Sequence, residues 1–297
     1  MTHTDPGWAL QALGLDNATI APLGGSMSSS AVYRVSLVGS DAVLKVTPDQ
    51  GEGDDLPAAR RELDFYLTLA RGLPLRTPRL IDHLSSADAV VLLLTAHHPA
   101  ELAPAWDEVS WLRLAGDLAA LHDSPVPTAA QWHRRSWVAD RLCEPDLERA
   151  LRFWSRPGEA ELIEPILNDP SALAQAITAP APCFLHGDCH VANLLREEGS
   201  IVWTDWQGAG AGSPAVDLAF PSVRGVPDDA HLPQAAMLAE YIALRGLNAQ
   251  EIGSAVIAAE LAIFLLEWPR YASFNTDAGI SRVHQRVKDL AQAWNAR

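Results

Sequence analysis

The sequence predicts an α+β fold in two lobes, a small β-rich N-terminal lobe and a larger, mainly helical C-terminal lobe. Two observations predict it. Up to about residue 95, runs rich in β-branched and other apolar residues alternate with Gly/Ser turns. After about residue 104, apolar residues recur at helical spacing. We therefore expect an N-terminal lobe over 1–95, a connector over 96–104 and a C-terminal lobe over 105–297.

The N-terminal part begins with a short amphipathic helix carrying Trp8, Leu10 and Leu13, and continues with strands. Turn residues at 24–30 and 39–41 divide the following stretch into three antiparallel strands. In the third strand Lys45 lies on the face opposite Ala42, Leu44 and Val46, because side chains alternate along a strand. The stretches after it predict a helix and two strands, at 56–72, 79–83 and 89–95.

The C-terminal part is predicted to be helical except at one place. A helix over 108–122 places Trp111, Leu114, Leu118 and Leu121 on one stripe. Further helical stretches cover roughly 131–155, 158–168, 231–245, 249–274 and 279–295. The exception is 184–206, where a polar loop is followed by a short strand, "SIVWTDW".

Composition excludes several classes of protein. The net charge of −15 argues against nucleic acid as a partner, because phosphate contacts need basic patches. We see no secretory signal, and the longest apolar run, at 255–266, contains Glu260 and is too short to span a bilayer. Three cysteines with no CxxC pair argue against a disulfide framework. We expect a cytoplasmic protein that binds no membrane, as a monomer or homodimer.

The loop "LHGDCHVANLL" at 185–195 holds several chemically active residues, and three kinds of site are compatible with such a set. A zinc site needs ligands from a second Cys/His pair, and none stands elsewhere at ligand spacing. A Cys189 nucleophile is disfavoured, because consecutive residues seldom place a thiol and its base in useful geometry. A site for phosphoryl transfer is the third possibility. It requires a carboxylate near the acceptor hydroxyl, metal ligands, a cation on the phosphates and a loop over them.

All the parts for phosphoryl transfer occur in order along the chain. Asp188 and Asn193 stand five residues apart, and Asp205 ends the strand "IVWTD" twelve residues later. Upstream, Lys45 is one of only two lysines in the chain, beside 20 arginines, and Glu62 falls on the next helix. The Gly/Ser loop at 24–30, just before the lysine strand, could contact phosphate oxygens through backbone N–H groups and hydroxyls.

With these motifs the sequence resembles the aminoglycoside phosphotransferase family, whose fold is that of the eukaryotic-type protein kinases. The resemblance rests on "LHGDCHVANLL", on "VWTDWQGAGAGSPAVDLA" at 202–219 and on "LAALH" at 118–122. It covers most of the chain in the order of its elements, and the first motif is highly specific. It implies a kinase that uses ATP or GTP with Mg²⁺ and phosphorylates a hydroxyl of a small molecule.

The resemblance also implies roles for individual residues. Asp188 would accept the proton of the acceptor hydroxyl, and Asn193 and Asp205 would hold Mg²⁺. The loop around Asp188 would be supported by His186, His190 and Asp217. The nucleotide would bind to the Gly/Ser loop, to the lysine and its glutamate, and to the connector, through Gly25, Ser26, Ser28, Ser29, Ser30, Lys45, Glu62, Leu94 and Ala96.

Two departures from the family pattern are visible. The phosphate loop reads "GGSMSSS" instead of Gly-x-Gly-x-x-Gly, and Gln207 stands where family members often carry an acidic residue. The second departure removes one carboxylate and leaves any second-metal contact there in doubt.

The acceptor is less determined than the chemistry. Residues 96–297 hold 26 acidic and 15 basic residues, an excess that favours a cationic acceptor. The leading hypothesis is therefore an antibiotic kinase that acts on an aminoglycoside or a tuberactinomycin-type peptide and confers resistance. A macrolide kinase, a metabolic kinase of the choline or homoserine type and a non-catalytic nucleotide-binding pseudokinase stay open. Acceptor contacts are expected from the late helices, at Glu240, Glu267, Trp268 and Asp277.

Overall fold

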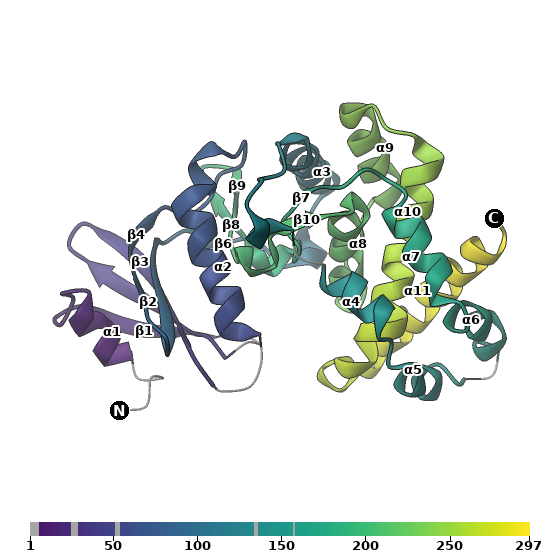
Figure 1. Cartoon of the computed structure of the whole chain (residues 1–297), viewed down its shortest axis with the longest axis horizontal. Helices are drawn as coiled ribbons and strands as arrows, with labels where there is room; N and C mark the ends of the chain where they lie inside the picture. The colour runs from purple at the N-terminus through teal and green to yellow at the C-terminus, as the bar shows by residue number, and fades with distance from the viewer. Residues whose placement is uncertain (1–5, 25–28, 51–53, 134–135, 157) are drawn as a thin grey trace. The chain divides into compact units, whose positions relative to one another are not determined.

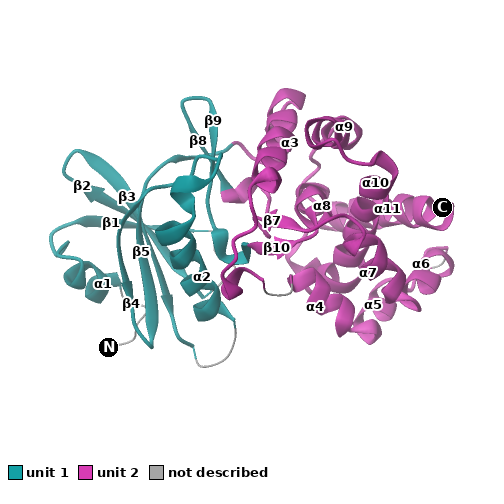
Figure 2. Cartoon of the chain, turned by 45° about the horizontal axis from the view of Figure 1, so that its top comes forward, with its two compact units in different colours: residues 1–100, 194–209 teal, residues 101–193, 210–297 magenta. Residues whose placement is uncertain are grey.

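In a computed structural model of the chain, two compact units can be distinguished (Figure 2). The structure describes residues 6–24, 29–50, 54–133, 136–156 and 158–297. Unit 1 comprises residues 1–100 and 194–209, and unit 2 comprises residues 101–193 and 210–297. Unit 1 is built around a sheet and unit 2 is mainly helical, so the predicted α+β fold class is confirmed.

The centre of unit 1 is a five-stranded antiparallel sheet (Figure 1). Its strands follow the order β1-β2-β3-β5-β4. Their bounds are β1 Thr19–Leu23, β2 Ala31–Leu37, β3 Ser40–Pro48, β4 Leu80–Ser85 and β5 Ala89–Thr95. The apolar run of β5 is buried along nearly its whole length, as expected of a strand covered on both faces.

Helices cover both faces of this sheet. Helix α1 (Pro6–Ala12) buries Ala9 and Leu10 against Ala42, Leu44 and Val46 of β3. Helix α2 (Asp55–Thr68) packs against β3, β4 and β5, and a short 3₁₀ turn, η1 (Ala70–Gly72), follows it. Because side chains alternate along β3, the residues between those buried by α1 point to the face that α2 covers.

Residues 194–209 differ from the predicted boundaries, which placed them in the C-terminal lobe. Strands β8 (Leu194–Glu197) and β9 (Ser200–Trp203) form a hairpin, and β8 pairs with β6 (His98–Pro99). A parallel bridge joins Arg76 to Val202, and the 3₁₀ turn η5 (Trp206–Gly208) packs on α2. The connector strand β6 thus belongs to this unit as well, and its partner is supplied from almost a hundred residues away.

Unit 2 contains α3 to α11 and a short two-stranded sheet. The sheet pairs β7 (Cys183–Leu185) with β10 (Gly210–Gly212). The first five helices are α3 Glu108–Asp123, α4 Trp137–Cys143, α5 Leu147–Phe153, α6 Ala160–Leu167 and α7 Pro170–Thr178. The others are α8 Pro214–Gly225, α9 Gln234–Arg245, α10 Ala249–Ala262 and α11 Asp277–Asn295. Short 3₁₀ turns, η2 Ala103–Ala105, η3 Ala130–Trp132 and η4 Val191–Asn193, lie in the connections.

Helix α10 lies at the centre of unit 2, where it packs against α7, α8 and α11. Its path continues as a π-helical turn, η6 (Ile263–Glu267), and two 3₁₀ turns, η7 (Trp268–Arg270) and η8 (Ala272–Phe274). The segment 249–270 is long and apolar enough to cross a membrane, yet 61% of its most apolar window is buried inside the protein. Such a segment is also the signature of a core helix, and that is the position it occupies here.

Two helical predictions need correction, and two helices were not predicted. The stretch 131–155 is two helices, α4 and α5, because Pro145 lacks the backbone N–H needed to continue a helix. The stretch 249–274 changes winding after Ala262, and Pro269 lies in the 3₁₀ turn that follows. Helices α7 and α8 occur where no helix was expected, and each has proline in its first turn, a position that tolerates it.

Candidate active site

Lys45 joins two carboxylates within unit 1. The alternation along β3 points its side chain to the α2 face of the sheet, where its exposed fraction is 11%. Its Nζ donates to Glu62 Oε2 at 2.7 Å and to Asp205 Oδ1 at 2.8 Å. Burial would lower the pKa of this amine, but the two carboxylates outweigh burial and hold it above its usual value. Lys45 is therefore a fixed cation.

Asp205 has a backbone conformation that few residues adopt. It lies two residues after β9, immediately before η5, with φ 63° and ψ 59°, the left-handed region, which costs a non-glycine residue free energy. Its Oδ1 accepts from Lys45, whereas Oδ2 has no partner in the described part of the chain. One carboxylate oxygen is thus left for a ligand.

Two contacts that the sequence did not predict hold the segment after Asp205. The indole of Trp206 stacks on Phe65 of α2, with ring centroids 4.0 Å apart and planes at 10°. Arg61 of α2 donates to the carbonyl of Gln207. No local sequence pattern predicts these contacts, because their partners lie about 140 residues apart. The one available signal is that Arg61 and Phe65 are four residues apart and therefore lie on the same face of the helix, close to Glu62.

In unit 2, Asp217 organises the loop that carries Asp188. Its two carboxylate oxygens accept the backbone N–H groups of His186 at 2.7 Å and of Gly187 at 2.8 Å. Gly187 has φ 82°, a conformation that side-chain-bearing residues rarely adopt. Asp217 Oδ2 also lies 3.2 Å from His122 Nε2, and the other ring nitrogen of His122 lies 2.8 Å from the Tyr241 hydroxyl. Asp217, His122 and Tyr241 are all buried, so the network rests in the core.

Asp188 and Asn193 form the other end of this loop. The Asn193 amide nitrogen donates to both the carbonyl and the side chain of Asp188, each at 2.9 Å. His190 Nε2 lies 3.6 Å from Asp188 Oδ1, and the ring of His186 accepts the Asp188 N–H at 3.3 Å. Burial raises the pKa of Asp188, but His190, His186 and the Asn193 amide outweigh it, so the pKa lies below its usual value. The carboxylate is ionised at neutral pH.

The cysteine of the loop has no chemical environment that would activate it. Cys189 is fully buried, and burial, followed by the nearby aspartates, raises the pKa of its thiol well above the usual range. A thiol held protonated in this way is a poor nucleophile.

Two of the five residues expected to form the phosphate loop, Ser29 and Ser30, lie within the described residues. Gly25, Ser26 and Ser28 lie outside the described residues. The Ser29 N–H donates to Asp55 at 2.9 Å, and its buried hydroxyl has no partner in the described part of the chain. Ser30 is buried, and its hydroxyl lies 2.8 Å from that of Thr47.

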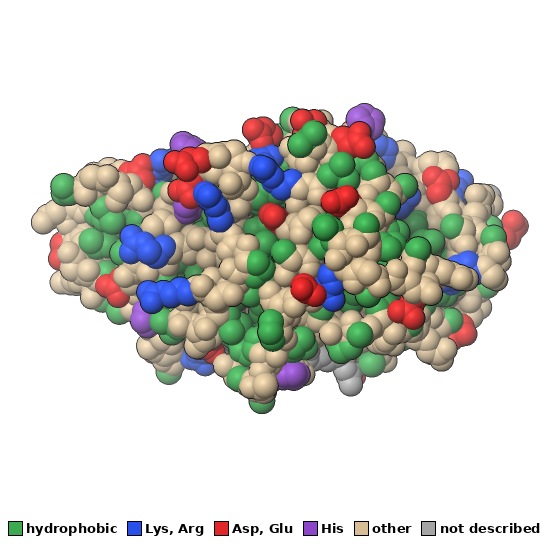
Figure 3. Space-filling view, turned by 90° about the horizontal axis from the view of Figure 1, so that it is seen from above, with side chains coloured by type: hydrophobic (Ala, Val, Ile, Leu, Met, Phe, Trp, Pro, Cys, Tyr) green, Lys and Arg blue, Asp and Glu red, His purple; other side chains and the backbone are tan. Residues whose placement is uncertain are grey.

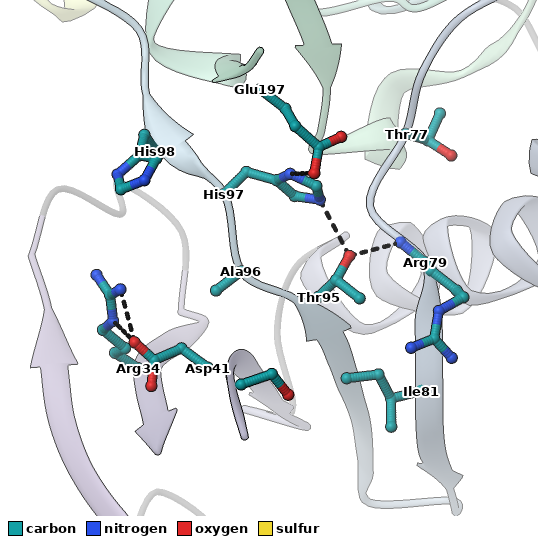
Figure 4. Close-up of a pocket in the computed structure, with 11 residues that line it drawn as sticks. Arg34, Asp41, Thr77, Arg79, Ile81, Thr95, Ala96, His97, His98 and Glu197 are labelled. Carbon is teal, nitrogen blue, oxygen red and sulfur yellow. Dashed lines mark hydrogen bonds and ion pairs between the residues drawn. The ribbon is translucent and has the colours of Figure 1, made fainter. Parts of the chain in front are cut away.

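A cavity of about 590 Å³ lies beside the connector, entirely within unit 1 (Figure 4). It is lined by Arg34, Ser40, Asp41, Thr77, Arg79, Ile81, Thr95, Ala96, His97, His98 and Glu197. His97 lies between Thr95 and Glu197, at 3.0 and 3.4 Å, and burial lowers the pKa of its ring. Of the two connector residues expected to contact the nucleotide, Ala96 lines this cavity and donates its N–H to Asp41, and Leu94 is buried in β5.

The four residues expected to contact the acceptor do not share one environment. Glu240 and Asp277 are exposed, on α9 and at the start of α11. Trp268 is buried and its ring packs on Phe153. Glu267 is also buried and accepts from Arg141 at 2.5 Å.

Each unit offers an oxygen donor of the kind that a hard divalent cation prefers. Because the Asn193 nitrogen donates to Asp188, its amide oxygen is the atom left to a ligand, and Asp205 offers a carboxylate oxygen. Mg²⁺ prefers such oxygens, and it commonly completes its shell with water and phosphate instead of an all-protein cage. Within the described ranges, no group of three or more His, Cys, Asp or Glu residues could hold a metal ion.

Comparisons with known proteins bear on this arrangement. The sequence pattern of the phosphotransferase enzyme family matches residues 19–248. No curated protein matches the chain in sequence. Among solved structures, a microcompartment-associated aminopropanol kinase is similar, with a TM-score of 0.65, 20% identity and coverage of 97% of this chain and 95% of that one.

Two further solved structures are also similar to the chain, and their names refer to other small molecules. A choline kinase from Cryptosporidium parvum Iowa II has a TM-score of 0.65 at 12% identity, covering 97% of this chain and 92% of its own. An aminoglycoside phosphotransferase, solved with ADP and hygromycin B, has a TM-score of 0.62 at 13% identity, covering 97% and 98%. At these identities the three structures show a shared protein-kinase-like fold and leave the acceptor undecided.

Proposed function

Because the chain belongs to the phosphotransferase enzyme family, we propose that it transfers the γ-phosphate of ATP or GTP to a hydroxyl group of a small molecule. The observation that carries the proposal is Lys45 between Glu62 and Asp205, at 2.7 and 2.8 Å. A buried cation fixed by two carboxylates is the part that phosphoryl transfer needs to bind and neutralise nucleotide phosphates.

The proposed roles follow from the contacts. Lys45 binds the α/β-phosphates, and Glu62 holds its side chain in place. Asp188, ionised and oriented by the Asn193 amide, accepts the proton of the acceptor hydroxyl. Asn193 and Asp205 would hold Mg²⁺, which when bound neutralises charge on the transferred phosphate. His186, His190 and Asp217 support the loop, and the nucleotide base would bind near Leu94 and Ala96.

The acceptor is proposed more narrowly from charge. The acidic excess of residues 96–297 supports a cationic antibiotic, as expected from the sequence, and exposed Glu240 and Asp277 belong to that excess. On the face seen in Figure 3, however, acidic and basic side chains are interspersed instead of gathered into an acidic patch. Glu267, which was expected to contact a cationic acceptor, is already paired with Arg141, and this weakens the support for an antibiotic relative to a metabolic acceptor. A macrolide has no comparable support.

A cytoplasmic location is proposed as well. It is supported by three free cysteines, one of them exposed. Free thiols are typical of a reducing compartment such as the cytoplasm, where nucleoside triphosphates are available.

The test is nucleotide consumption by the purified chain with Mg²⁺, measured against a panel of hydroxylated amines, acids, sugars and antibiotics. We expect turnover with at least one acceptor and its loss in Asp188→Asn. Nucleotide binding with no turnover for any acceptor would support a pseudokinase instead. Equal turnover by Asp188→Asn would contradict the role given to that carboxylate.

A further inference from the structure

Two helices of unit 2 bring aromatic side chains against the loop that carries Asp188. Trp137, the first residue of α4, donates its indole N–H to the carbonyl of Gly187 at 3.2 Å. Its ring packs edge-on against Phe220 of α8, with centroids 5.7 Å apart. The ring of Phe220 in turn lies 6.0 Å from that of His190. Residues 187–190 are therefore in contact with α4 and α8 together.

Each of these helices carries an arginine one turn beyond its aromatic residue. Arg141 follows Trp137 by four positions, and Arg224 follows Phe220 by four positions. Residues four apart lie on the same helix face, separated by about 6 Å along the axis. Both arginines thus project from the two helix faces that meet the catalytic loop.

A third arginine joins them from the segment after α10. Glu267 Oε2 accepts from Arg141 at 2.5 Å and lies 3.8 Å from Arg270. Burial, and then the Glu267 charge, raise the pKa of the neighbouring Tyr271 phenol, while Arg270, Arg141 and Arg224 oppose them. The charges of three guanidinium groups and one carboxylate therefore act on the same phenol.

This cluster is incompletely neutralised. Glu267 can balance one of the three positive charges, and within the described ranges the side chain of Arg224 has no hydrogen-bond or ion-pair partner. Arg224 is exposed, and the side chains of Arg141 and Arg270 are 38% and 34% exposed. The whole chain has a net charge of −15. The local excess of two positive charges beside the loop that carries Asp188 therefore has the opposite sign to the charge of the chain.

The backbone at Glu267 is also unusual. Residues 263–267 form a π-helical turn, and Glu267 is its last residue. Such turns are rare and often occur at functional sites, because the extra residue re-aims the side chains that follow. Here the turn precedes the Glu267–Tyr271 segment that meets Arg141.

We propose that the acceptor is a small hydroxyl compound bearing a carboxylate or phosphate group, and that this group binds Arg224 with Arg141 and Arg270 while the hydroxyl lies at Asp188. The proposal rests on the proposed phosphotransferase function. Guanidinium groups bind carboxylates and phosphates through paired, charge-assisted hydrogen bonds. A polycationic acceptor would meet like charge at the same place.

Matched acceptors test the proposal. Pairs that share a hydroxyl and differ in the anion are 4-hydroxybutyrate with its methyl ester and glycerol 3-phosphate with glycerol, and choline and kanamycin serve as cationic acceptors. We expect kcat/KM for the anionic member of a pair to exceed that of its neutral partner by about tenfold or more. The two pairs distinguish a carboxylate from a phosphate.

Arginine variants give the second readout. Arg224→Ala should raise KM for the anionic acceptor about tenfold, with kcat changed little and the neutral partner unaffected. Arg224→Lys keeps the positive charge but lacks the planar guanidinium group that can donate two parallel hydrogen bonds, so it should restore only part of the affinity. Arg152→Ala on α5 removes a well-exposed arginine elsewhere and is the matched control, expected to behave as the wild type.

Binding without turnover separates this inference from the proposed function. The rise in Tm caused by 4-hydroxybutyrate and by glycerol 3-phosphate, with no nucleotide present, should be lost in Arg224→Ala. If this binding is found and no acceptor is phosphorylated, the phosphotransferase proposal fails and the anion site stands. Preferred turnover of choline or kanamycin, insensitive to Arg224→Ala, would overturn the anion site alone. Absence of both turnover and Arg224-dependent binding would overturn both.

Discussion

Replacing Lys45 by methionine tests whether the buried ion cluster of unit 1 behaves as described. Methionine keeps an unbranched side chain of nearly the same length and removes its charge. Glu62, whose side chain is 1% exposed, then loses its cation. Removing one partner of a buried ion pair costs about 3–5 kcal/mol, because the remaining charge is left uncompensated.

The cost has an upper limit, because Glu62 can take up a proton instead of staying charged. Protonating a carboxyl of ordinary pKa near 4.3 at pH 7 costs about 3.7 kcal/mol, at about 1.36 kcal/mol per pH unit. Burial lowers this cost further by raising the pKa of an unpaired Glu62. We therefore expect Lys45→Met to lose about 3 kcal/mol of unfolding free energy at pH 7.

The same reasoning fixes the sign of the pH dependence. In the variant the folded pKa of Glu62 lies above its unfolded value, so the folded state binds the extra proton and the stability falls as pH rises through that interval. The loss relative to wild type should shrink to about 1 kcal/mol at pH 5.

Urea unfolding followed by tryptophan fluorescence measures these differences, because Trp206 stacks on α2 beside Glu62. Lys45→Met/Glu62→Gln removes the Lys45 and Glu62 charges and leaves only Asp205, whose side chain is 34% exposed, so it should recover most of the loss. A loss below about 0.5 kcal/mol at pH 7, or one that does not shrink in acid, would refute the ion cluster as the source of stability.

Three other predictions concern unit 2. Asp188→Asn should lower kcat by about a thousandfold or more with nucleotide affinity nearly unchanged, since its contact acts in the transition state; single-turnover kinetics and nucleotide titration separate the two effects. Cys189→Ala should leave kcat within about threefold, because the buried thiol stays protonated, and a large loss would point to thiol chemistry. Burial lowers the pKa of His284 in spite of Glu159 at 2.7 Å, so the unfolded chain binds the proton more readily and stability should fall as pH drops below about 6.5. Urea midpoints between pH 5 and 8 would show this slope, of at most about 1.4 kcal/mol per pH unit, and His284→Gln should flatten it.

The sequence predicted those features that depend on local pattern. Alternation in β3 put Lys45 on one face, and the helical stripe of 108–122 became α3. Spacing along the loop put Asp188 and Asn193 within hydrogen-bond reach of each other. Helices α7 and α8 were missed because proline weighs against a helix, although proline in the first turn is compatible with one.

Contacts between distant segments were beyond local reasoning. Glu267 was expected to attract a cation from the acceptor, but its carboxylate is paired with Arg141, 126 residues away in sequence. The Trp137 contact with Gly187 spans 50 residues and leaves no signal in the sequence around either partner. Neutralisation of a charge is decided by such pairings, which composition and periodicity do not contain.

The hairpin β8–β9 has a consequence for synthesis of the chain on the ribosome. Residues 194–209 complete unit 1, yet residues 101–193 of unit 2 are translated before them. Lys45 and Glu62 are therefore synthesised early, whereas their partner Asp205 is added only after more than two thirds of the polypeptide has been made. N-terminal segments usually fold first during translation. Here the first hundred residues can form their sheet early, but the ion cluster of Lys45 and Glu62 is completed only after the later segment 194–209 has been made. Because each unit consists of two separate segments, no single cut in the chain yields either unit whole.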